Sequence, residues 1–571
     1  MTIVEHAGPR HAPRSPGTVQ AAKRRHRLWA HLAGLAVVLI ALLPVMSPMG
    51  TFTSDEGAYA LQARALAHGT WAYEYRAASL DPSGQSFPIV LSDRSGDQYL
   101  TYVKHPAYPL LLSGAIRVAG DAVGLHLWPL IGVLGTAAAA WLLAGEIDPR
   151  LRVGAFWLAA TGPVLVNGYL AWAHSLSAAV AGFTLLAAVR ILRRGPSALR
   201  VTALGAGACA GVLLRSEGLL FAGAVGAALA LVTWRQAGPG RRLAARTLVR
   251  SMGLSLLVAV PALATALAER AWVHTLARGS VENFQARSAG SGTSTGQLSG
   301  AWRDLLGGPT LALLGMAALV WFGVVAVRRS GTAAKAAGAA LTAGAVSCLA
   351  LQAIQLHADS GAAYLGLLVA WPVAVLGLLL VRWRTSEPAV RLMGVAAAVF
   401  GLAVVATEYV DGGGLEWGGR FFFPLLAPIA ALAVSGLDRL VAGAPRRRAV
   451  GLLAAVAAST AVAGLVVVGT ARADQQRVAD AVARHPAPVT VTTVTALPRV
   501  AWSVDSRVTF MLTDHDRLAG LLSDLGARGV RELNLVTGRI DTGALGPFHI
   551  AAEAKEPALA DHGLRLVTLR A

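Results

Sequence analysis

Charged residues are scarce in this sequence. Only 14% of its 571 residues are charged, whereas soluble domains usually carry about 25%. Hydrophobic residues make up 55%, and the mean hydropathy is +0.55. Many apolar stretches approach the roughly 20 residues that a helix needs to cross a bilayer. The composition therefore excludes an ordinary soluble protein and predicts a polytopic α-helical membrane protein.

Cysteine and the common cofactor motifs are also nearly absent. Cys209 and Cys348 are the only cysteines, and both lie within apolar stretches. They exclude a disulfide framework and a cysteine-ligated metal site, and we expect them to pack as small buried side chains. The sequence has no P-loop, no Rossmann glycine fingerprint and no convincing His, Asp and Glu spacing for a metal. We expect no cofactor, and the metal requirement stays open.

Acidic residues are fewer than basic ones: 31 against 50, for a formal net charge of +19. Such a charge raises the question of nucleic-acid binding. The arginines, however, form short clusters between apolar spans, as the positive-inside rule expects of cytoplasmic loops. No basic stripe with interleaved aromatic residues is present. We therefore expect membrane lipids as partners, and no nucleic acid.

Apolar spans that alternate with basic clusters predict about thirteen transmembrane helices. Residues 1–27 are expected to be a disordered cytoplasmic tail. The first span is too long for a secretory h-region and has no cleavage site after it, so it stays uncleaved. The predicted spans are residues 28–46, 123–144, 153–169, 175–192, 201–214, 218–234, 252–268, a span ending at 328, 336–356, 364–381, 392–407, 420–437 and 449–469.

An odd number of spans places the C-terminus outside the cell. The predicted transmembrane domain covers residues 28–470 and carries a long external loop at 50–108. Residues 105–119 are apolar but short, which is typical of an interfacial helix. Residues 471–571 carry more charge and no spanning segment, which predicts a small extracytoplasmic α/β domain. Its expected elements are strands at 488–492, 530–536 and 564–569 and a helix at 514–525.

Two adjacent acidic residues, Asp55 and Glu56, follow the outer end of the first predicted span. Charge beside the hydrocarbon is costly and marks functional candidates. The alternative is ordinary capping, in which Thr53 or Ser54 caps a helix that runs to about His68. The helix dipole also stabilises acidic residues in the first turn of a helix. A carboxylate at this position would also bind a hydroxyl and accept its proton. The residues alone leave both interpretations open.

The same external loop closes with Lys104, His105 and Tyr108. A cation and an imidazole at the outer interface would hold a lipid phosphate. The alternative is an interfacial anchor, in which the lysine snorkels and the tyrosine belongs to the aromatic belt. The two interpretations have equal weight.

Two further charged sites interrupt later spans on the predicted outer side. Arg215 and Glu217 separate two spans, where they form either a self-neutralising bridge or a cavity that holds an anion. Arg420 follows Trp417 and two glycines at a helix N-terminus. A cation is unfavourable there unless an anion is bound, and glycines allow close approach of a ligand to the backbone. We therefore favour a functional role for Arg420.

Together these segments resemble the GT-C glycosyltransferases. The shared features are the acidic pair after the first span, a proline-containing loop closure, an Arg-x-Glu-Gly-like break and a Trp-Gly-x-Arg-Phe-like start of a late span. The resemblance covers residues 28–470 and is greatest to protein O-mannosyltransferases, aminoarabinose transferases and bacterial lipid-linked-sugar transferases. Ala107 stands where the family often has a second proline. The composition is similar to that of mycobacterial arabinosyl- and mannosyltransferases.

The resemblance implies an inverting glycosyltransferase that moves a sugar from a polyprenyl-phosphate donor to a cell-envelope acceptor, which is a glycan, a lipid or a protein. Asp55 would be the general base on the acceptor hydroxyl, and Glu56 would orient the acceptor or tune Asp55. Cationic residues would stabilise the departing phosphate. The residues implied for phosphate binding are Lys104, His105, Arg215 and Arg420, and those for substrate contact are Tyr59, Tyr108, Glu217 and Trp417.

Two other classes of protein stay open. A transporter or flippase would usually show repeated halves with broken spans in matching positions, and no second copy of the acidic loop is visible. A catalytically inactive scaffold would use the external domain to bind a cell-wall partner. The sequence does not identify the sugar, the acceptor or the oligomeric state. Arabinofuranose and mannose are the leading expectations.

Overall fold

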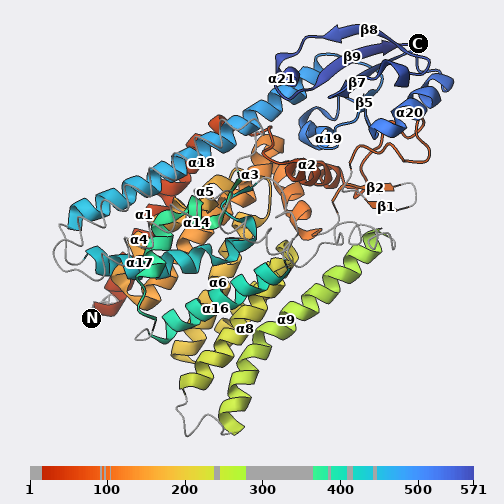
Figure 1. Ribbon diagram of the computed structural model, residues 1–571. Coiled ribbons are helices and arrows are strands. Elements are labelled where there is room, and N and C mark those ends of the chain that lie inside the picture. The colour runs from red at the N-terminus through yellow and green to blue at the C-terminus, as the bar shows by residue number, and fades with distance from the viewer. Residues whose placement is uncertain are drawn as a thin grey trace, which may run out of the picture.

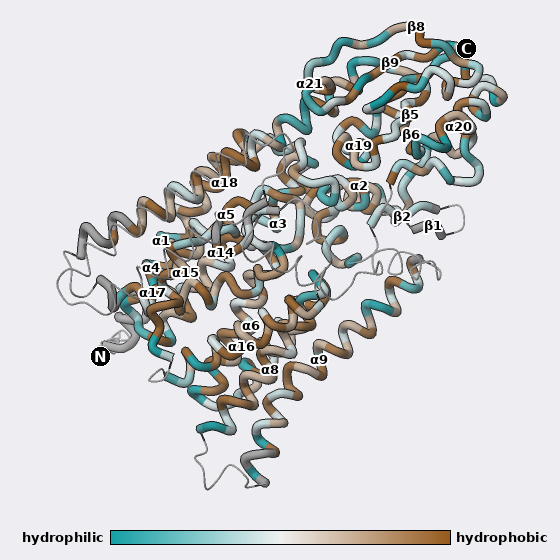
Figure 2. Tube along the Cα trace, viewed as in Figure 1, coloured by the Kyte–Doolittle hydropathy of each residue, from teal (hydrophilic) through white to brown (hydrophobic). Residues whose placement is uncertain are grey.

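Long apolar helices make up most of this structure. It is a computed structural model that describes residues 16–89, 93–95, 98–102, 105–236, 245–277, 364–383, 387–407, 416–441 and 446–571. Figure 1 shows the helices as a bundle, with a small domain of strands and short helices at one end. Figure 2 shows that hydrophobic residues dominate the bundle, while hydrophilic residues are more frequent in the small domain. This is the polytopic α-helical architecture that the composition predicts.

The first half of the bundle carries the long loop predicted at residues 50–108 at one of its ends (Figure 1). Its helices are α1 (Pro16–Leu42), α2 (Ser54–Ala67), α3 (Ala107–Ile147), α4 (Arg152–Ala160), α5 (Pro163–Asn167), α6 (His174–Arg194), α7 (Ala198–Leu214), α8 (Glu217–Gln236) and α9 (Ala245–Ala277). Two short 3₁₀ turns, η1 (Leu43–Met46) and η2 (Pro149–Leu151), follow α1 and α3. Strands β1 (Asp93–Ser95) and β2 (Gln98–Leu100) form an antiparallel pair in the loop.

The second half begins with β3 (Tyr364–Leu365), which pairs in parallel with β4 (Glu416–Trp417). Its helices are α14 (Leu367–Ala370), α15 (Pro372–Leu379), α16 (Pro388–Thr407), the 3₁₀ helix η5 (Arg420–Leu425), α17 (Leu426–Val441) and α18 (Arg446–Ala483). The predicted spans at 336–356 and before 328 lie outside the described residues.

Eight helices in the described part of the chain are long and apolar enough to cross a membrane, and α7 is a shorter apolar helix. On α9 the side chains of Met252, Leu256, Val260, Leu263 and Leu267 are all exposed. They recur every three or four residues, so they form one face of the helix. A large apolar face open to the surroundings is typical of a lipid-facing helix. The predicted membrane bundle is therefore confirmed.

Several helix boundaries differ from the predicted spans. The helix α1 begins at Pro16, so it includes part of the segment predicted as a disordered tail. The predicted boundary between an interfacial helix and the second span falls at Gly120, where the backbone leaves helical geometry with φ of 72°. Glycine tolerates this left-handed conformation. The predicted span at 153–169 consists of two short helices, α4 and α5, because Pro163 begins the second one.

The C-terminal domain is built on a five-stranded sheet with the strand order β6-β5-β7-β9-β8. Its strands are β5 (Thr490–Thr492), β6 (Phe510–Leu512), β7 (Glu532–Thr537), β8 (His549–Ala554) and β9 (Arg565–Arg570). Its helices are α19 (Leu497–Val500), α20 (His515–Ala527) and α21 (Pro557–Ala560), with 3₁₀ turns η6 (Trp502–Val504) and η7 (Thr542–Ala544). The predicted α/β domain is confirmed, with its predicted helix and three predicted strands in place.

The C-terminal domain is attached to the bundle through α18 and through the loop at residues 50–108. The helix α18 runs continuously across the predicted boundary at residue 470. The loop contributes hydrogen bonds: Arg76 donates to the carbonyl of Val508 at 2.7 Å, and the amide of Leu512 donates to the carbonyl of Ser86 at 2.8 Å. The end of the bundle that carries α2 is therefore covered by residues of both regions.

Candidate active site

The helix α2 positions the acidic pair. Thr53 is its N-cap, with the extended backbone that this position requires. One carboxylate oxygen of Glu56 accepts hydrogen bonds from the amides of Phe52 at 2.6 Å and Thr53 at 3.1 Å. This is the back-bonding half of a capping box. The capping interpretation is thus correct for Glu56.

The other carboxylate oxygen of Glu56 faces the interior. It lies 2.6 Å from Nη1 of Arg472, and it accepts from the amide of Ala171 at 2.9 Å. The side chains of Glu56 and Arg472 are 2% and 1% exposed. Arg472 belongs to α18 and also donates to the carbonyl of Met46 at 2.9 Å. All these contacts are with the protein itself, so Glu56 fixes the start of α2 against α18.

Asp55 has different surroundings, and its side chain is 37% exposed. One oxygen lies 3.6 Å from Nη1 of Arg420, and the other lies 3.5 Å from Nη1 of Arg499. The two arginines come from different regions of the protein: Arg420 begins η5 in the membrane bundle, and Arg499 belongs to α19 in the C-terminal domain. An accessible carboxylate is thus held between two largely buried guanidinium groups.

The position of Arg420 is set by the two glycines before it. Gly418 and Gly419 have φ of 86° and 63°, a conformation that favours glycine, and a β-carbon at Gly418 would overlap Pro163. The guanidinium carbon of Arg420 then lies 5.3 Å from the ring centre of Trp172 and 5.0 Å from that of Phe421. Such cation–π contacts stabilise a cation that is withdrawn from water.

Arg499 was not predicted from the sequence. Its helix α19 packs so closely on α2 that a β-carbon at Gly57 would overlap the carbonyl oxygen of Arg499. The side chain of Arg499 is 11% exposed. Burial lowers its pKa, and the nearby Asp55 carboxylate opposes that shift. Arg499 lies in a segment without a recognisable motif, so local sequence held no signal for it.

Arg215 and Glu217 form a tight ion pair. Two guanidinium nitrogens of Arg215 donate to the two oxygens of Glu217 at 3.0 and 2.6 Å. Burial lowers the pKa of Arg215, but the ion pair outweighs it, so the pKa is raised overall. The guanidinium of Arg215 also lies 5.8 Å from the ring centre of Phe421, which Arg420 contacts too. The structure therefore shows the bridge and places it beside the Arg420 site.

Three tyrosines pack together next to these charges. The hydroxyls of Tyr59 and Tyr102 are 2.7 Å apart, and their ring centres are 4.0 Å apart. The ring of Tyr108 meets Tyr59 edge-on at 5.3 Å. Burial raises the pKa of Tyr59 and Tyr102, so both keep their protons. The charges of Arg215 and Asp55 both act on Tyr59, which places this cluster against the site.

The remaining sequence candidates have separate positions. His105 is buried, with Nδ1 at 3.2 Å from Glu269 of α9. The ring of Trp417 packs against Gly464 of α18, where a β-carbon would lie 2.7 Å from it, and its carbonyl accepts from Asn167 at 3.0 Å. Trp417 therefore fills space between α5 and α18. Lys104 lies outside the described residues.

His174 is a further polar residue at this end of the bundle. Its ring is 4.9 Å from that of Trp172 and 5.9 Å from that of Phe423, both in edge-on contacts. Within the described residues neither ring nitrogen has a hydrogen-bond partner, although both are buried. Buried polar atoms are normally hydrogen-bonded, so His174 has unused hydrogen-bonding capacity next to Arg420's aromatic neighbour.

Comparisons with known proteins identify the fold. No protein-family model matches the sequence, and neither does any curated protein. Among solved structures, apo ArnT from Cupriavidus metallidurans is similar with a TM-score of 0.51 and 13% identity, over 94% of this chain and 98% of that chain. ArnT from that organism bound to undecaprenyl phosphate gives 0.48 and 13%, over 94% and 97%. AglB from Archaeoglobus fulgidus, in complex with an inhibitory peptide and a dolichol-phosphate, gives 0.46 and 14%, over 90% and 69%.

The GT-C fold predicted from the sequence is therefore confirmed by the likeness to apo ArnT.

Proposed function

We propose that this protein is an inverting glycosyltransferase that moves a sugar from a polyprenyl-phosphate donor to an extracytoplasmic acceptor. One observation carries the proposal: the accessible carboxylate of Asp55 lies between the guanidinium groups of Arg420 and Arg499. A base beside two cations suits a reaction that removes a proton from one substrate and develops negative charge on the other. The GT-C fold supports this assignment.

Asp55 is the proposed general base. Its exposed fraction of 37% leaves room for an acceptor hydroxyl to reach an oxygen. Asp55 takes the proton from this hydroxyl, whose oxygen forms a bond to the anomeric carbon of the sugar. The bond from that carbon to the phosphate oxygen breaks on the opposite face, and its electron pair leaves with the lipid phosphate. The configuration at the anomeric carbon is therefore inverted.

Arg420 and Arg499 are the proposed ligands of the donor phosphate. Their distances of 3.6 and 3.5 Å to Asp55 are longer than a strong charge-assisted hydrogen bond of about 2.7–2.9 Å. Both groups can thus turn toward an incoming phosphate while they stay near the carboxylate. Fixed cations are most effective where water is excluded, and both side chains are largely buried.

The other candidate residues contribute to the proposed site in different ways. Arg215 is already neutralised by Glu217, so the pair shapes the site and contributes less to phosphate binding. Tyr59 and Tyr108 are almost completely buried in the protein, and they stay predicted substrate contacts. His105 and Lys104 stay predicted phosphate contacts. Glu56 holds the start of α2 and so aims Asp55.

The distribution of arginines supports an extracytoplasmic site. Arg190, Arg193 and Arg194 end α6, where Arg190 and Arg194 form ion pairs with Glu146. His174 begins the same helix at the Asp55 end. The positive-inside rule favours the arginine-rich end for the cytoplasm. Asp55 and the C-terminal domain would then lie outside, where lipid-linked sugars meet a cell-envelope glycan, lipid or protein.

A direct transfer assay tests the proposal. Purified protein is incubated with a panel of polyprenyl-phosphate sugars, led by arabinofuranose and mannose donors, and released polyprenyl phosphate is measured. Asp55→Asn should fold normally and lower turnover by about 10²–10⁴-fold, the usual effect of losing a general base. Asp524→Asn, an exposed aspartate on α20, is the matched control and should stay active.

Full turnover by Asp55→Asn would remove this residue from the mechanism. Release of no lipid phosphate from any donor, together with translocation of a lipid-linked substrate across vesicles, would replace the proposal with the transporter class.

A further inference from the structure

A cavity of about 280 Å³ lies at the other end of the bundle from Asp55. The Asp55 site is near the start of α6 and α8, whereas this cavity is between the end of α6, the end of α8 and the start of α9. At 1.5 Å per residue, the 21 residues of α6 span about 30 Å, the thickness of a bilayer core. The two sites therefore face opposite membrane surfaces. The cavity is lined by Ile191, Leu192, Pro196, Thr233, Gln236, Arg246, Arg250 and Leu254.

Two arginines give this cavity its charge. Arg246 and Arg250 are exposed and lie in the first two turns of α9, four residues apart. Like charges at this spacing repel each other, and cations oppose the positive end of a helix dipole. None of the eight lining residues is acidic. The arrangement is unfavourable alone, and a bound anion would reverse both effects.

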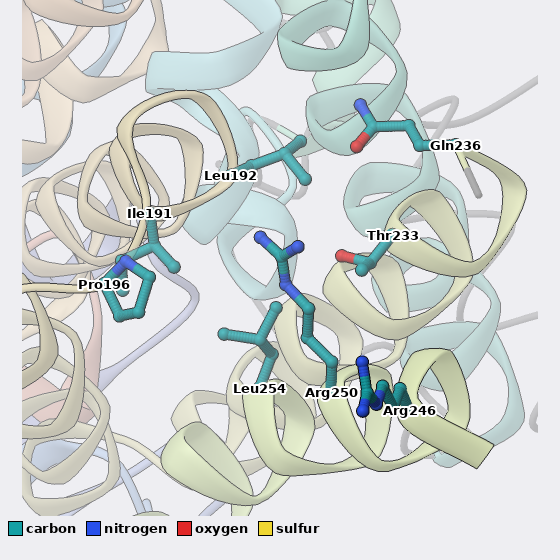
Figure 3. A pocket seen from close by; sticks show the side chains of 8 residues that line it. All are labelled: Ile191, Leu192, Pro196, Thr233, Gln236, Arg246, Arg250 and Leu254. Carbon is teal, nitrogen blue, oxygen red and sulfur yellow. The ribbon is translucent and has the colours of Figure 1, made fainter. Parts of the chain in front are cut away.

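Thr233 supplies an independent observation. Its side chain is 8% exposed, and its hydroxyl oxygen has no hydrogen-bond partner in the described part of the chain. A threonine within a helix commonly donates its hydroxyl to a carbonyl one turn earlier, and Thr233 does not. Figure 3 shows the hydroxyl directed into the cavity, on the side where the Arg250 guanidinium extends across it. A ligand oxygen in the cavity would satisfy it.

The opposite wall of the cavity is apolar. Ile191 and Leu192 of α6 lie across the cavity from Arg250, and Leu254 lies beside Arg250 on α9 (Figure 3). A small soluble anion has no apolar part that could pack against these side chains. The glycerol and the first acyl carbons of a phospholipid could pack against them. Basic pockets between transmembrane helices on the cytoplasmic side are suited to anionic headgroups.

We propose that this cavity binds the headgroup of an anionic phospholipid. The phosphate lies between Arg246 and Arg250, and the Thr233 hydroxyl donates to a phosphate or glycerol oxygen. The first acyl carbons rest on Leu192 and Leu254. The site is separate from the Asp55 site, so it would hold a lipid as a structural or regulatory ligand and not as a sugar donor.

Lipid binding to the full-length protein tests the proposal. Delipidated protein in a neutral detergent is titrated with phosphatidylglycerol, phosphatidylcholine or inorganic phosphate, and bound lipid is counted by native mass spectrometry. Each arginine near a membrane surface contributes about fivefold to anionic-lipid affinity. The Arg246→Gln/Arg250→Gln variant should therefore bind phosphatidylglycerol on the order of twentyfold more weakly, with phosphatidylcholine binding unchanged. Thr233→Val should weaken it several-fold.

Arg150→Gln is the matched control, because Arg150 is an exposed arginine near the end of α3, at the same surface. An equal loss in this control would show general surface attraction and overturn the proposal. Equal affinity of the wild-type protein for both lipids would also overturn it. If millimolar inorganic phosphate displaces the lipid, the site binds a soluble anion instead, and the proposal is overturned. If the double arginine variant does not fold, unchanged phosphatidylglycerol binding by Thr233→Val overturns the proposal.

Discussion

The ion pair of Glu56 with Arg472 leads to a stability prediction that separates it from the neighbouring Asp55 site. The two side chains are almost completely buried, and Nη1 of Arg472 lies 2.6 Å from Oε2 of Glu56. Arg472 donates further to the carbonyls of Met46 and Ser47. The pair therefore joins α18, the end of the first membrane helix and the start of α2.

Removing one partner leaves the other charge buried, which usually costs about 3–5 kcal/mol. Glu56→Gln keeps the shape of the side chain and an oxygen for the capping amides, so we expect the lower end of this range. Arg472→Met also leaves the carbonyl of Met46 without its donor, which adds about 1–3 kcal/mol. In Glu56→Gln/Arg472→Met no unpaired charge is left, so the double variant should lose roughly 2 kcal/mol less than the sum of the single variants.

Denaturant unfolding in detergent, followed by tryptophan fluorescence, measures these differences. Arg477→Met is the control, because Arg477 lies on the same helix with a side chain that is 66% exposed. Its effect should stay within about 0.5 kcal/mol. Single variants as stable as the wild type, or effects that simply add in the double variant, would refute the reasoning from burial and charge.

Two further predictions concern the C-terminal side of the site. Arg499→Gln should lower turnover on the order of 100-fold, as loss of one donor to a developing anion does. Arg507 is an exposed arginine nearby, so Arg507→Gln is the control and should keep its turnover. Equal turnover of the two variants in the lipid-phosphate assay would remove Arg499 from the site. Gly57→Ala should force α19 away from α2, because the new β-carbon would overlap the Arg499 carbonyl. Turnover should therefore fall, and protease cleavage of the C-terminal domain should accelerate. A fully active, protease-resistant variant would contradict this packing.

Much of the fold follows from local sequence signals. Apolar length predicted the membrane helices, and a capping residue followed by an acidic pair predicted α2 from Thr53 to about His68. The short apolar length of residues 105–119 predicted a break before the span at 123–144, and the break in α3 lies at Gly120. The strands β5, β7 and β9 are apolar runs between turns, so they were found. The strand β8 was missed because most of its residues are exposed and it has no apolar alternation.

Only some residues of the candidate site could be predicted from the sequence, and the reason is physical. Asp55 and Arg420 stand in short distinctive segments at the ends of apolar spans, and such segments can be recognised locally. Arg499 and Arg472 reach the acidic pair from more than 400 residues away in sequence. Their roles depend on how α18 and α19 pack on α2, and no periodicity or motif encodes a contact of that range.

The two acidic residues show how adjacent positions on a helix take different roles. Consecutive residues point about 100° apart around a helix of 3.6 residues per turn. When Glu56 turns inward to Arg472 and Ala171, Asp55 must turn away from the bundle, toward Arg420 and Arg499. The capping interpretation and the proposed catalytic one are therefore compatible, because the first concerns Glu56 and the second concerns Asp55. Since one cation of the Asp55 site belongs to the C-terminal domain, we infer that this domain completes the site instead of serving as a separate binding module.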